Sequence, residues 1–554
     1  MREKLQAKIK EVVSEIFDVE VEPVISVPEE QFGDYSTNVA LQLADQNHKA
    51  PHEIADKIAK SLQEKLSDDA ESVDIAEPGF INIRLSVSAL WERANETETY
   101  KPMTYKDQSI VIETNNPNPF KDLHIGHAYN SVVGDTISNL LGLGQAKVHR
   151  VSYHGDVGLH VGKSMWAILR FIDGDPDKLK TIPETKRPTF LSQKYLEGST
   201  AYEEDASAKK EIEDLSQQSF VLDDPIFKTV YEICNSWSFE YFDRIFQSIG
   251  SRPVEKRYLE RDADNAGRGI VESNIGPVFT KSDGAVIFEG EKYGLHTRVF
   301  ISSRGLTLYE ARDLGLMKLK AEDFNPQASY IVTANEQKEY FEVILKAAEL
   351  IMPEVAKMTR NISTGMVKLS TGKMSSRTGN AINIGWLIEA IKSALSSRKS
   401  SHEGQEQTIV GALRYSMLKN RIGSDLVFDV NDAISLEGNS GPYLQYAYAR
   451  SRSILAKVTS ESQELPGDID KDERRLLRKL GDYQNVLDKA VSELLPHQLC
   501  GYLYELAQLF NQFYEHNRVL GDERENIRVN LVRKYSDILK SGLDVLGIPA
   551  PDRI

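Results

Sequence analysis

The segment that most constrains the fold is a short apolar run followed by a polar loop and a regular apolar pattern. Residues Ser109 to Glu113 place three β-branched side chains in a row, which predicts a buried strand. A loop rich in Asn and Pro follows, and then apolar spacing that predicts a helix from Gly126 to about Leu143. Strand, loop and helix in this order begin a βαβ unit, so a parallel sheet covered by helices is expected.

Three later apolar runs are expected to continue this sheet: Val148 to Tyr153, Arg298 to Ile301 and Tyr330 to Thr333. Between them, residues from about Pro176 to Asp264 are charged, helical in pattern and poor in strand signals. We therefore expect an insertion, over about 175–290, between two halves of the sheet.

A chain of 554 residues is too long for one hydrophobic core, and about three or four domains are expected. We predict an α+β domain at 1–100, an α/β domain at 101–400 and an all-helical domain at 401–554. The first has amphipathic helices from Arg2 to Ile16 and from Pro51 to Leu66 and an alternating strand at 80–85. After residue 385 the pattern is almost wholly helical.

Composition narrows the class of protein. With 40% hydrophobic and 27% charged residues the chain is typical of soluble globular proteins, and no run of 18 apolar residues or signal-peptide core is present. The two cysteines lie far apart without a Cys-x-x-Cys pair, which favours a reducing, cytoplasmic setting without a zinc site. The net charge of −16 is awkward for a nucleic-acid partner, but most of the acidic excess precedes Gly411.

Two segments suggest phosphate chemistry. His124-Ile125-Gly126-His127 lies where the helix after the first strand begins, and helix N-termini present free N–H groups to anions. His124 and His127 can donate hydrogen bonds to a phosphate, and Gly126 permits a flat base to approach. The second segment runs from Lys373 to Arg377. Taken singly, each segment could also be an ordinary helix cap or a solvated turn.

The residues around these two segments resemble a known protein family. The stretch from Glu113 to His127 resembles the signature loop and helix of class I aminoacyl-tRNA synthetases, and within them the arginyl-tRNA synthetase family. Lys373-Met374-Ser375-Ser376-Arg377 resembles the second motif of that class. The residues from Gly305 to Asp313 are similar to the arginyl family's Gly-x-Thr-x-Tyr-x-x-Arg-Asp block.

This resemblance implies a site for ATP and one for arginine. Catalytic roles fall to His124, His127 and Lys373, with no metal held by the protein itself and Mg²⁺ arriving with ATP. The residues implied in ATP binding are His124, Gly126, His127, Lys373, Met374, Ser375 and Arg377. Those implied in arginine binding are Glu113, Asn118, His154, Asp156, Tyr309, Asp313 and Gln337.

The residue types suit these roles. A guanidinium is planar, permanently charged and fork-shaped, so carboxylates in bidentate reach and a flat aromatic wall should select it. Glu113 ends an apolar strand, and an unpaired buried carboxylate is costly, so we expect it to need a cationic partner such as the free amino acid. The sequence departs from the family at Tyr129, where arginine is usual, and at His160, where glutamine is usual.

The resemblance extends over nearly the whole chain. Gln31 to Ala40 and Glu77 to Asn82 are similar to the family's N-terminal tRNA-contacting domain, and Tyr446 to Arg450 to its helical anticodon-binding domain. The expected fold is therefore α/β, with a Rossmann-type class I core carrying an insertion, an N-terminal α+β domain and a C-terminal all-α domain. The implied activity is arginine–tRNA ligation, with tRNA(Arg), L-arginine and ATP as partners of a monomer that does not contact membranes.

Three alternatives remain open from the residues. A class I synthetase for another amino acid would leave Glu113 and Asp313 without a cation. A silent tRNA-binding scaffold would not require His124, His127 and Lys373. A plain nucleotidyltransferase with the histidine motif would lack both flanking domains.

Overall fold

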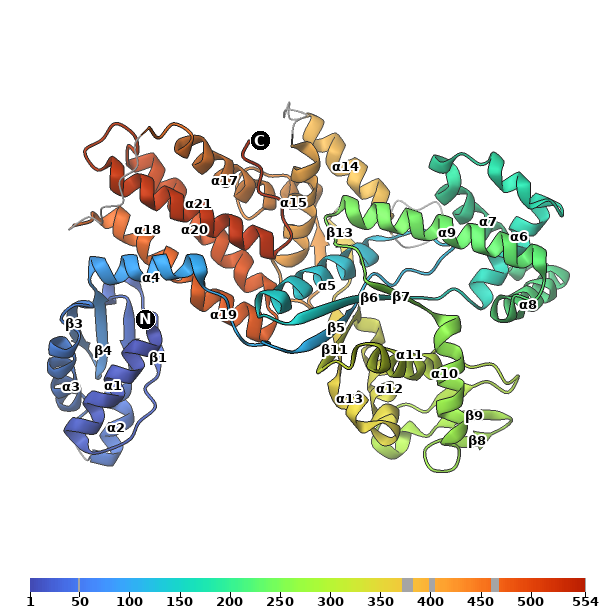
Figure 1. Ribbon diagram of the computed structural model, residues 1–554, viewed down its shortest axis with the longest axis horizontal. Helices are drawn as coiled ribbons and strands as arrows, with labels where there is room; N and C mark the ends of the chain where they lie inside the picture. Colours follow the sequence, from blue (N-terminus) through green and yellow to red (C-terminus); the bar gives the residue numbers. More distant parts are fainter. Residues whose placement is uncertain (48–49, 371–381, 398–403, 460–467, 554) are drawn as a thin grey trace.

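The computed structural model describes residues 1–47, 50–370, 382–397, 404–459 and 468–553, and its chain forms an elongated molecule of several parts (Figure 1). The N-terminal part is a four-stranded antiparallel sheet in the order β1-β2-β4-β3, with helices packed on it. Its elements are α1 (Arg2–Phe17), β1 (Ile25–Ser26), η1 (Glu30–Phe32), β2 (Tyr35–Thr37), α2 (Val39–Asn47), α3 (Pro51–Lys65), β3 (Ala70–Ala76) and β4 (Phe80–Leu85). The expected α+β fold is confirmed, with α2 as an additional helix.

A five-stranded parallel sheet occupies the centre of the molecule, in the order β12-β11-β5-β6-β7. The three branched side chains of β5 are fully buried, as expected for a central strand covered on both faces. Its strands and flanking helices are β5 (Ser109–Glu113), α5 (Ile125–Leu143), β6 (Lys147–His154), β7 (Lys256–Leu259), α10 (Glu260–Ser273), α11 (Tyr309–Phe324), β11 (Ala328–Ala334), η5 (Asn335–Gln337), α12 (Lys338–Ile351), α13 (Pro353–Met358) and β12 (Thr359–Thr364).

Two sequence expectations about this sheet are wrong. The run Arg298–Ile301 is β10, which pairs antiparallel with β9 (Ala285–Phe288) in a separate three-stranded sheet completed by β8 (Thr280–Ser282). The fifth central strand is β7, which lies inside the predicted insertion of 175–290. β7 is an edge strand of four residues that begins with Lys256 and Arg257, and such a strand has little of the apolar signal that identifies a buried one.

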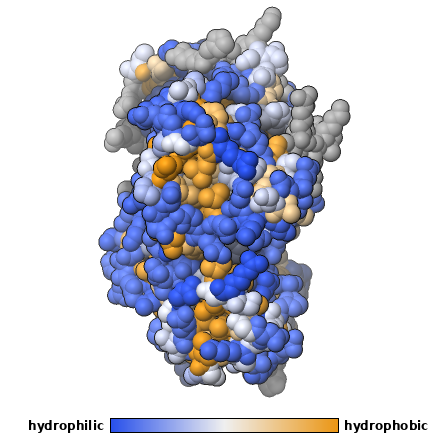
Figure 2. Space-filling view, turned by 90° about the vertical axis from the view of Figure 1, so that its right-hand side faces the viewer, coloured by the Kyte–Doolittle hydropathy of each residue, from blue (hydrophilic) through white to orange (hydrophobic). Residues whose placement is uncertain are grey.

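The insertion proper is helical and has its own core. Phe120, Met165, Tyr231 and Cys234 are among its buried members. Its surface, shown with the small sheet in Figure 2, carries apolar patches divided by hydrophilic ones. The elements are α6 (Leu159–Ile172), η2 (Pro176–Thr181), η3 (Glu184–Lys186), α7 (Arg187–Glu204), α8 (Ala206–Val221) and α9 (Pro225–Ser248), and η4 (Gly290–Tyr293) belongs to the small sheet.

The C-terminal part is a helical bundle, as expected, apart from one short strand. β14 (Leu426–Phe428) pairs with β13 (Val367–Leu369). The helices are α14 (Ile384–Ser397), α15 (Gln405–Leu418), α16 (Val430–Ala433), α17 (Gly441–Leu455), α18 (Lys471–Gly481), α19 (Tyr483–Glu493), α20 (Pro496–His516) and α21 (Glu525–Val545). Across the described ranges, no helix is both long and apolar enough to cross a membrane.

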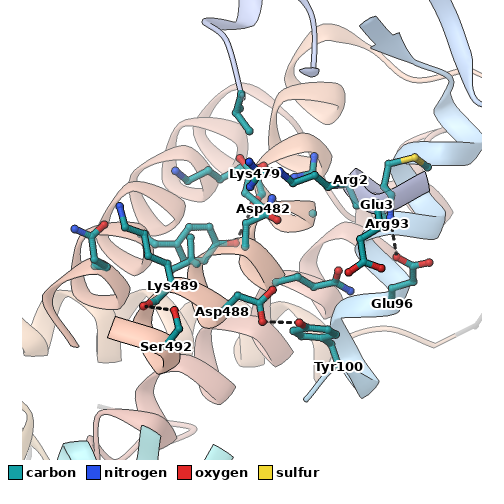
Figure 3. A pocket seen from close by; sticks show the side chains of 18 of the residues that line it. Arg2, Glu3, Arg93, Glu96, Tyr100, Lys479, Asp482, Asp488, Lys489 and Ser492 are labelled. Carbon is teal, nitrogen blue, oxygen red and sulfur yellow. Dashed lines mark hydrogen bonds and ion pairs between the residues drawn. The ribbon is translucent and has the colours of Figure 1, made fainter. Parts of the chain in front are cut away.

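The N-terminal part docks on the helical bundle through charged groups. Asp34 is 2% exposed, and its carboxylate receives Arg474 Nη2 at 2.9 Å, Arg478 Nε at 3.1 Å and the backbone N–H of Leu85 at 2.8 Å. Helix α4 (Val87–Thr99) then connects the two parts, with Arg93 paired to Asp482 (Figure 3). A cleft of about 1030 Å³ lies between them, away from the central sheet.

A second charged contact joins the helical bundle to the central sheet. Arg414 of α15 is completely buried, and its Nη2 donates to Asp135 Oδ2 of α5 at 2.6 Å. Asp135 also pairs with Arg150 Nη1 of β6 at 2.7 Å. Burial acts against the Asp135 charge, but Arg414 and Arg150 hold its pKa below the ordinary value. Helix α5 is thereby tied to both the sheet and the bundle.

We predict that Asp135→Asn destabilises the protein strongly, because it leaves Arg414 and Arg150 buried without a counter-charge. The expected loss is about 3–5 kcal/mol, read from the shift of the urea unfolding midpoint. The matched control is Asp552→Asn, which breaks an ion pair on the surface, where Arg452 Nε lies 3.1 Å from Asp552 Oδ1. This change should lower the free energy of unfolding by only about 0–1 kcal/mol. Equal shifts in the two variants would show that the buried pairs do not hold the domains together.

Candidate active site at the carboxyl edge of the parallel sheet

The order of the central sheet defines where a ligand can bind. From β5 the chain proceeds outward to β6 and β7 on one side and later to β11 and β12 on the other. In open parallel sheets of this kind, ligands bind outside the carboxyl ends of the strands, where the order reverses. Glu113, His154, Glu260 and η5 lie at these strand ends, and α5 begins beside them.

The two histidines lie at the N-terminus of α5. Their rings stack with centroids 3.7 Å apart, and the backbone N–H of His124 donates to His127 Nδ1 at 3.2 Å. His127 therefore caps the helix, which was the alternative interpretation of this motif from the sequence. Its Nε2 atom is still available to a ligand. A Cβ on Gly126 would lie 3.1 Å from the His124 ring, so glycine suits this close packing.

Both imidazoles are neutral at physiological pH. Burial, with the charges of His124 and Lys121, lowers the pKa of His127 to about 3, and burial together with Lys121 lowers that of His124. Neutral rings at a helix N-terminus act as hydrogen-bond donors to an anion such as phosphate.

The chain that follows the second predicted motif lies beside the N-terminus of α5. Residues Lys373, Met374, Ser375 and Arg377 lie outside the described residues, but the chain directly after them pairs with the α5 terminus. His124 bridges Asn383, the N–H of Ile125 donates to Ile382 O at 2.8 Å, and that of Ile384 to Leu123 O at 3.2 Å. Residues 123–125 and 382–384, which lie more than 250 positions apart in the sequence, therefore meet at one helix end.

Asp313 is the carboxylate without a cation in this site. It lies on the first turns of α11, and Tyr340 of α12 donates to its Oδ2 at 2.5 Å. Within the described chain no Lys, Arg or His nitrogen comes within ion-pair distance of it. Burial raises the pKa of Asp313 to about 7. The charges on Glu113 and Glu260 act in the same direction, and the Tyr340 hydrogen bond and the more distant charge of Lys320 act against it.

Glu113 is buried and has a cationic partner within the protein. It is 3% exposed, and Lys320 Nζ of α11 lies 2.5 Å from its Oε2, while Asn116 Nδ2 donates to Oε1 at 2.9 Å. Glu113 therefore has the cationic partner that its burial led us to expect, and the protein itself supplies it. A lysine two helical turns beyond Asp313 supplies that charge, and only the packing of α11 against β5 brings it there.

His154 and Asp156 are also bound within the protein. Both ring nitrogens of His154 are engaged, with Ser152 Oγ at 2.8 Å and Pro117 O at 2.7 Å, and burial lowers its pKa to about 4. Asp156 is fully buried and accepts from Tyr231 at 2.6 Å and Arg261 at 3.2 Å. Direct contact of His154 with a ligand, expected from the sequence, conflicts with these bonds, since neither ring nitrogen is left.

The remaining predicted residues line the same edge. Asn118 Oδ1 accepts the N–H of Gly155 at 3.1 Å, Tyr309 is 56% exposed at the start of α11, and Gln337 is exposed at the end of η5. His160 holds Gly155 O at 2.7 Å, and Tyr129 is buried in α5. The residues at both family departures therefore pack inside the protein.

Sequence reasoning missed four residues of the site: Tyr153, Glu260, Lys320 and Tyr340. The Tyr153 hydroxyl is buried without a hydrogen-bond partner in the described chain, and burial, together with the charges of Glu260 and Asp313, raises its pKa. Glu260 is 4% exposed and accepts from Arg312 Nη1 at 2.7 Å. A tyrosine at the end of a predicted strand was the one available signal, because the other three residues approach from separate helices.

These observations describe two neighbouring subsites with complementary chemistry. One presents neutral donors and a helix N-terminus, which suit phosphate, and the other presents an unpaired carboxylate among aromatic side chains, which suits a cation. A Rossmann-type sheet with such a motif at the helix after its first strand is the fold of class I aminoacyl-tRNA synthetases.

Comparison with known proteins specifies the family. The model for the tRNA synthetases class I (R) catalytic domain matches residues 92–430, the arginyl tRNA synthetase N terminal domain matches 3–85, and the DALR anticodon binding domain matches 444–554. The chain belongs to the arginyl-tRNA synthetase family of class I.

Relatives of full length support this placement. The arginine–tRNA ligase of Parabacteroides distasonis is 27% identical, covering 95% of this chain and 94% of the relative, and that of Borreliella burgdorferi is 28% identical over 90% and 89%. The solved arginyl-tRNA synthetase of Thermus thermophilus has the same fold, with a TM-score of 0.80, 22% identity and coverage of 100% of both chains.

The raised pKa of Asp313 predicts that its ionisation lowers the stability of the folded protein when no ligand is bound. An aspartate in an unfolded chain titrates near 3.9, so between about pH 4 and pH 7 the folded state holds the proton more tightly and stability falls as pH rises. Asp313→Asn removes this cost. We expect its thermal midpoint to exceed that of the parent near pH 8, with the difference vanishing near pH 4.

Asp323→Asn on the same helix is the matched control. Lys256 lies 2.6 Å from Asp323, and Tyr258 donates to it at 2.5 Å, so its pKa is lowered despite burial. This control should leave the midpoint near pH 8 unchanged or reduce it. A lower midpoint for Asp313→Asn as well would mean that the Asp313 charge is compensated in the fold.

Proposed function

We propose that the chain is an arginine–tRNA ligase, which activates L-arginine with ATP and transfers it to the 3′-terminal adenosine of tRNA(Arg). The observation that carries this proposal is the unpaired carboxylate of Asp313, placed at the same sheet edge as the histidine-bearing terminus of α5. A permanently charged guanidinium is the side chain that this carboxylate would best receive.

In the first step, a carboxylate oxygen of arginine attacks the α-phosphorus of ATP, and pyrophosphate leaves with its electron pair. His124 and His127 donate to the phosphates, and Gly126 leaves room for the adenine. Lys373, Met374, Ser375 and Arg377 are assigned to ATP by family resemblance, with Lys373 on the leaving phosphates, and Mg²⁺ accompanies them. Such transfer depends on position and charge rather than on covalent catalysis.

Arginine itself would lie along the strand ends. Its guanidinium faces Asp313, with Tyr309 as the aromatic wall, and Asn118 and Gln337 lie toward its amino and carboxylate groups. Asp156 acts on this site indirectly, because Tyr231 and Arg261 hold it in the loop after β6. Glu113 contributes its negative charge to this arginine site and is held in place by its ion pair with Lys320.

In the second step, the terminal 2′-hydroxyl of tRNA attacks the carbonyl carbon of arginyl-adenylate, and AMP leaves. The helical bundle offers a surface for unpaired bases: Tyr446 and Tyr514 are each 39% exposed, and Arg450 lies 4.9 Å and 5.8 Å from their ring centroids. Aromatic faces backed by arginine stack on bases of any sequence.

Two further assignments belong to this proposal. The buried free thiols of Cys234 and Cys500 suit the reducing cytoplasm, where we place the protein. We also propose that it acts as a monomer, which sedimentation of the purified chain would test.

ATP–pyrophosphate exchange, with each amino acid and with or without tRNA, tests the function. We expect exchange with arginine when tRNA is present. No exchange with arginine under that condition, or exchange with a neutral amino acid instead, would overturn the proposal.

Asp313→Ala should weaken arginine use far more than ATP use. A carboxylate that reads a guanidinium is expected to change the KM for arginine by roughly 10²-fold or more, the range of a lost charged hydrogen-bond pair. The KM for ATP and the exchange rate at saturating arginine report on the phosphate end. Parallel losses for both substrates would contradict the assignment of Asp313.

Replacing Arg450 by Gln and Tyr446 by Ala should weaken tRNA binding without changing arginine or ATP affinity. Base stacking contributes about 1–3 kcal/mol per base, so a loss of at least fivefold in tRNA affinity is expected in filter binding at fixed salt. Tyr293→Ala, an exposed tyrosine beside the small sheet, is the control. Equal tRNA affinity of the double variant and the control would remove this surface from the proposal.

A further inference from the structure

The insertion carries an open groove that the proposed function does not use. The groove lies between α6 and α8, with the first turn of α9 also lining it, and has a volume of about 870 Å³. None of its lining residues has a place in the ATP, arginine or tRNA sites. The insertion and the small sheet form the end of the molecule that faces the viewer in Figure 2, where apolar patches lie on the surface. This groove therefore needs an explanation of its own.

The walls of the groove are single faces of two helices. The residues of α6 that line it are Trp166, Leu169, Arg170 and Asp173. Those of α8 are Glu211, Asp214, Leu215 and Gln218. Both sets follow the i, i+3, i+4, i+7 spacing of one helix face, and seven residues of helix rise about 10 Å. The groove is therefore about two helical turns long, which suits a third helix laid between the walls.

The floor of the groove is apolar. Phe227 of α9 is 1% exposed, and Leu169 and Leu215 are partly buried and pack on the core of the insertion. At the end of α8 and the start of α9, Val221 is 65% exposed and Ile226 is 42% exposed. Apolar side chains that gather on a surface mark a place where a partner removes them from water.

The rim of the groove is negatively charged. The carboxylates that line it are Asp173, Glu211, Asp214 and Asp224. Arg170, the one cation among these lining residues, is paired with Glu211 at 2.9 Å. Among the residues that the structure describes, no Lys, Arg or His nitrogen lies within ion-pair distance of Asp214 or Asp224. The groove therefore presents net negative charge above an apolar floor.

The sign of this charge decides among the possible occupants. It repels the phosphate backbone of a nucleic acid and the surface of an anionic membrane. A second copy of this chain, with a net charge of −16, is also disfavoured. A cationic occupant with an apolar face meets both properties of the groove.

We infer that this groove binds an amphipathic helix of a partner protein, with apolar side chains on the groove floor and lysines or arginines against its carboxylates. Recognition of a helix in a groove uses apolar anchors at i, i+3, i+4 and i+7, which is the spacing that the two walls offer. The inference goes beyond the proposed function and does not depend on it.

The probe is a synthetic peptide of about 14 residues, long enough to form a helix, with leucines on one face and lysines on the other. Its affinity for the full chain is measured by fluorescence anisotropy at fixed salt. A second peptide with glutamates in place of the lysines is the control. We expect the basic peptide to bind at least about tenfold more tightly than the acidic one.

Charge reversal distinguishes the groove from the overall charge of the protein. Asp214→Lys combined with Gln218→Lys places two lysines on the α8 wall and should weaken binding of the basic peptide at least about tenfold. The matched control is Glu204→Lys combined with Gln193→Lys, two exposed positions of α7 outside the groove. It changes the net charge equally and should change the affinity less than about twofold.

Leu215→Gln tests the apolar floor and should weaken binding roughly fivefold without changing the charge. If this variant fails to fold, the charge-reversed pair still tests the inference, because Asp214 is exposed and Gln218 is half-buried.

Three outcomes would overturn the inference. They are no binding of the basic peptide, equal losses in the two charge-reversed variants, and a dimer in sedimentation that Asp214→Lys with Gln218→Lys abolishes. The last result would identify a second copy as the occupant. ATP–pyrophosphate exchange with arginine should be the same in the parent and in both charge-reversed variants, so a failure of the ligase activity is seen separately from a failure of peptide binding.

Discussion

The buried pairs of Asp135 with Arg414 and Arg150 are the interaction on which the arrangement of the whole molecule depends. They connect α5, β6 and α15, which belong to different parts of the chain. Arg414 also donates to Leu546 O and Gly250 O, and a Cβ on Gly547, at a φ of 68°, would lie 2.3 Å from it. A buried charge tolerates little displacement, so these contacts hold α5, and with it the histidine-bearing terminus, in one position relative to the sheet and the bundle.

The packing of α5 on the sheet supports the same geometry. A Cβ on Gly134 would lie 2.4 Å from Thr114 Oγ1, so glycine permits the helix to approach the end of β5. At its N-terminus, α5 pairs with residues 382–384 through backbone bonds. The proposed phosphate subsite is therefore assembled from two backbone segments, whose approach depends on small residues and on one network of buried charges.

The sequence predicted the parallel sheet, the three-part organisation and most of the residues at the sheet edge. It did not predict which strands pair with each other or which charged side chains form ion pairs. The run 298–301 has the apolar pattern of a core strand, yet it pairs in a separate sheet, because a pattern of burial does not specify which strand lies alongside. β7 was not predicted because a four-residue edge strand that begins with Lys256 and Arg257 carries little apolar signal. The cationic partner that Glu113 was expected to need is Lys320, which the packing of α11 brings to it over a separation of 207 residues.

What the sequence by itself determined is the chemistry of the site: two histidines and a glycine at a helix start, a strand ending in glutamate, and the Tyr309 and Asp313 pair one helical turn apart. These are local properties, because spacing along one strand or helix decides which side chains share a face. Only the tertiary structure decided which carboxylate is left without a cation. Electrostatic compensation depends on distance in space, and the cations that neutralise Glu113, Glu260 and Asp156 approach from helices α10 and α11. That is why the unpaired charge proved to be Asp313 rather than Glu113.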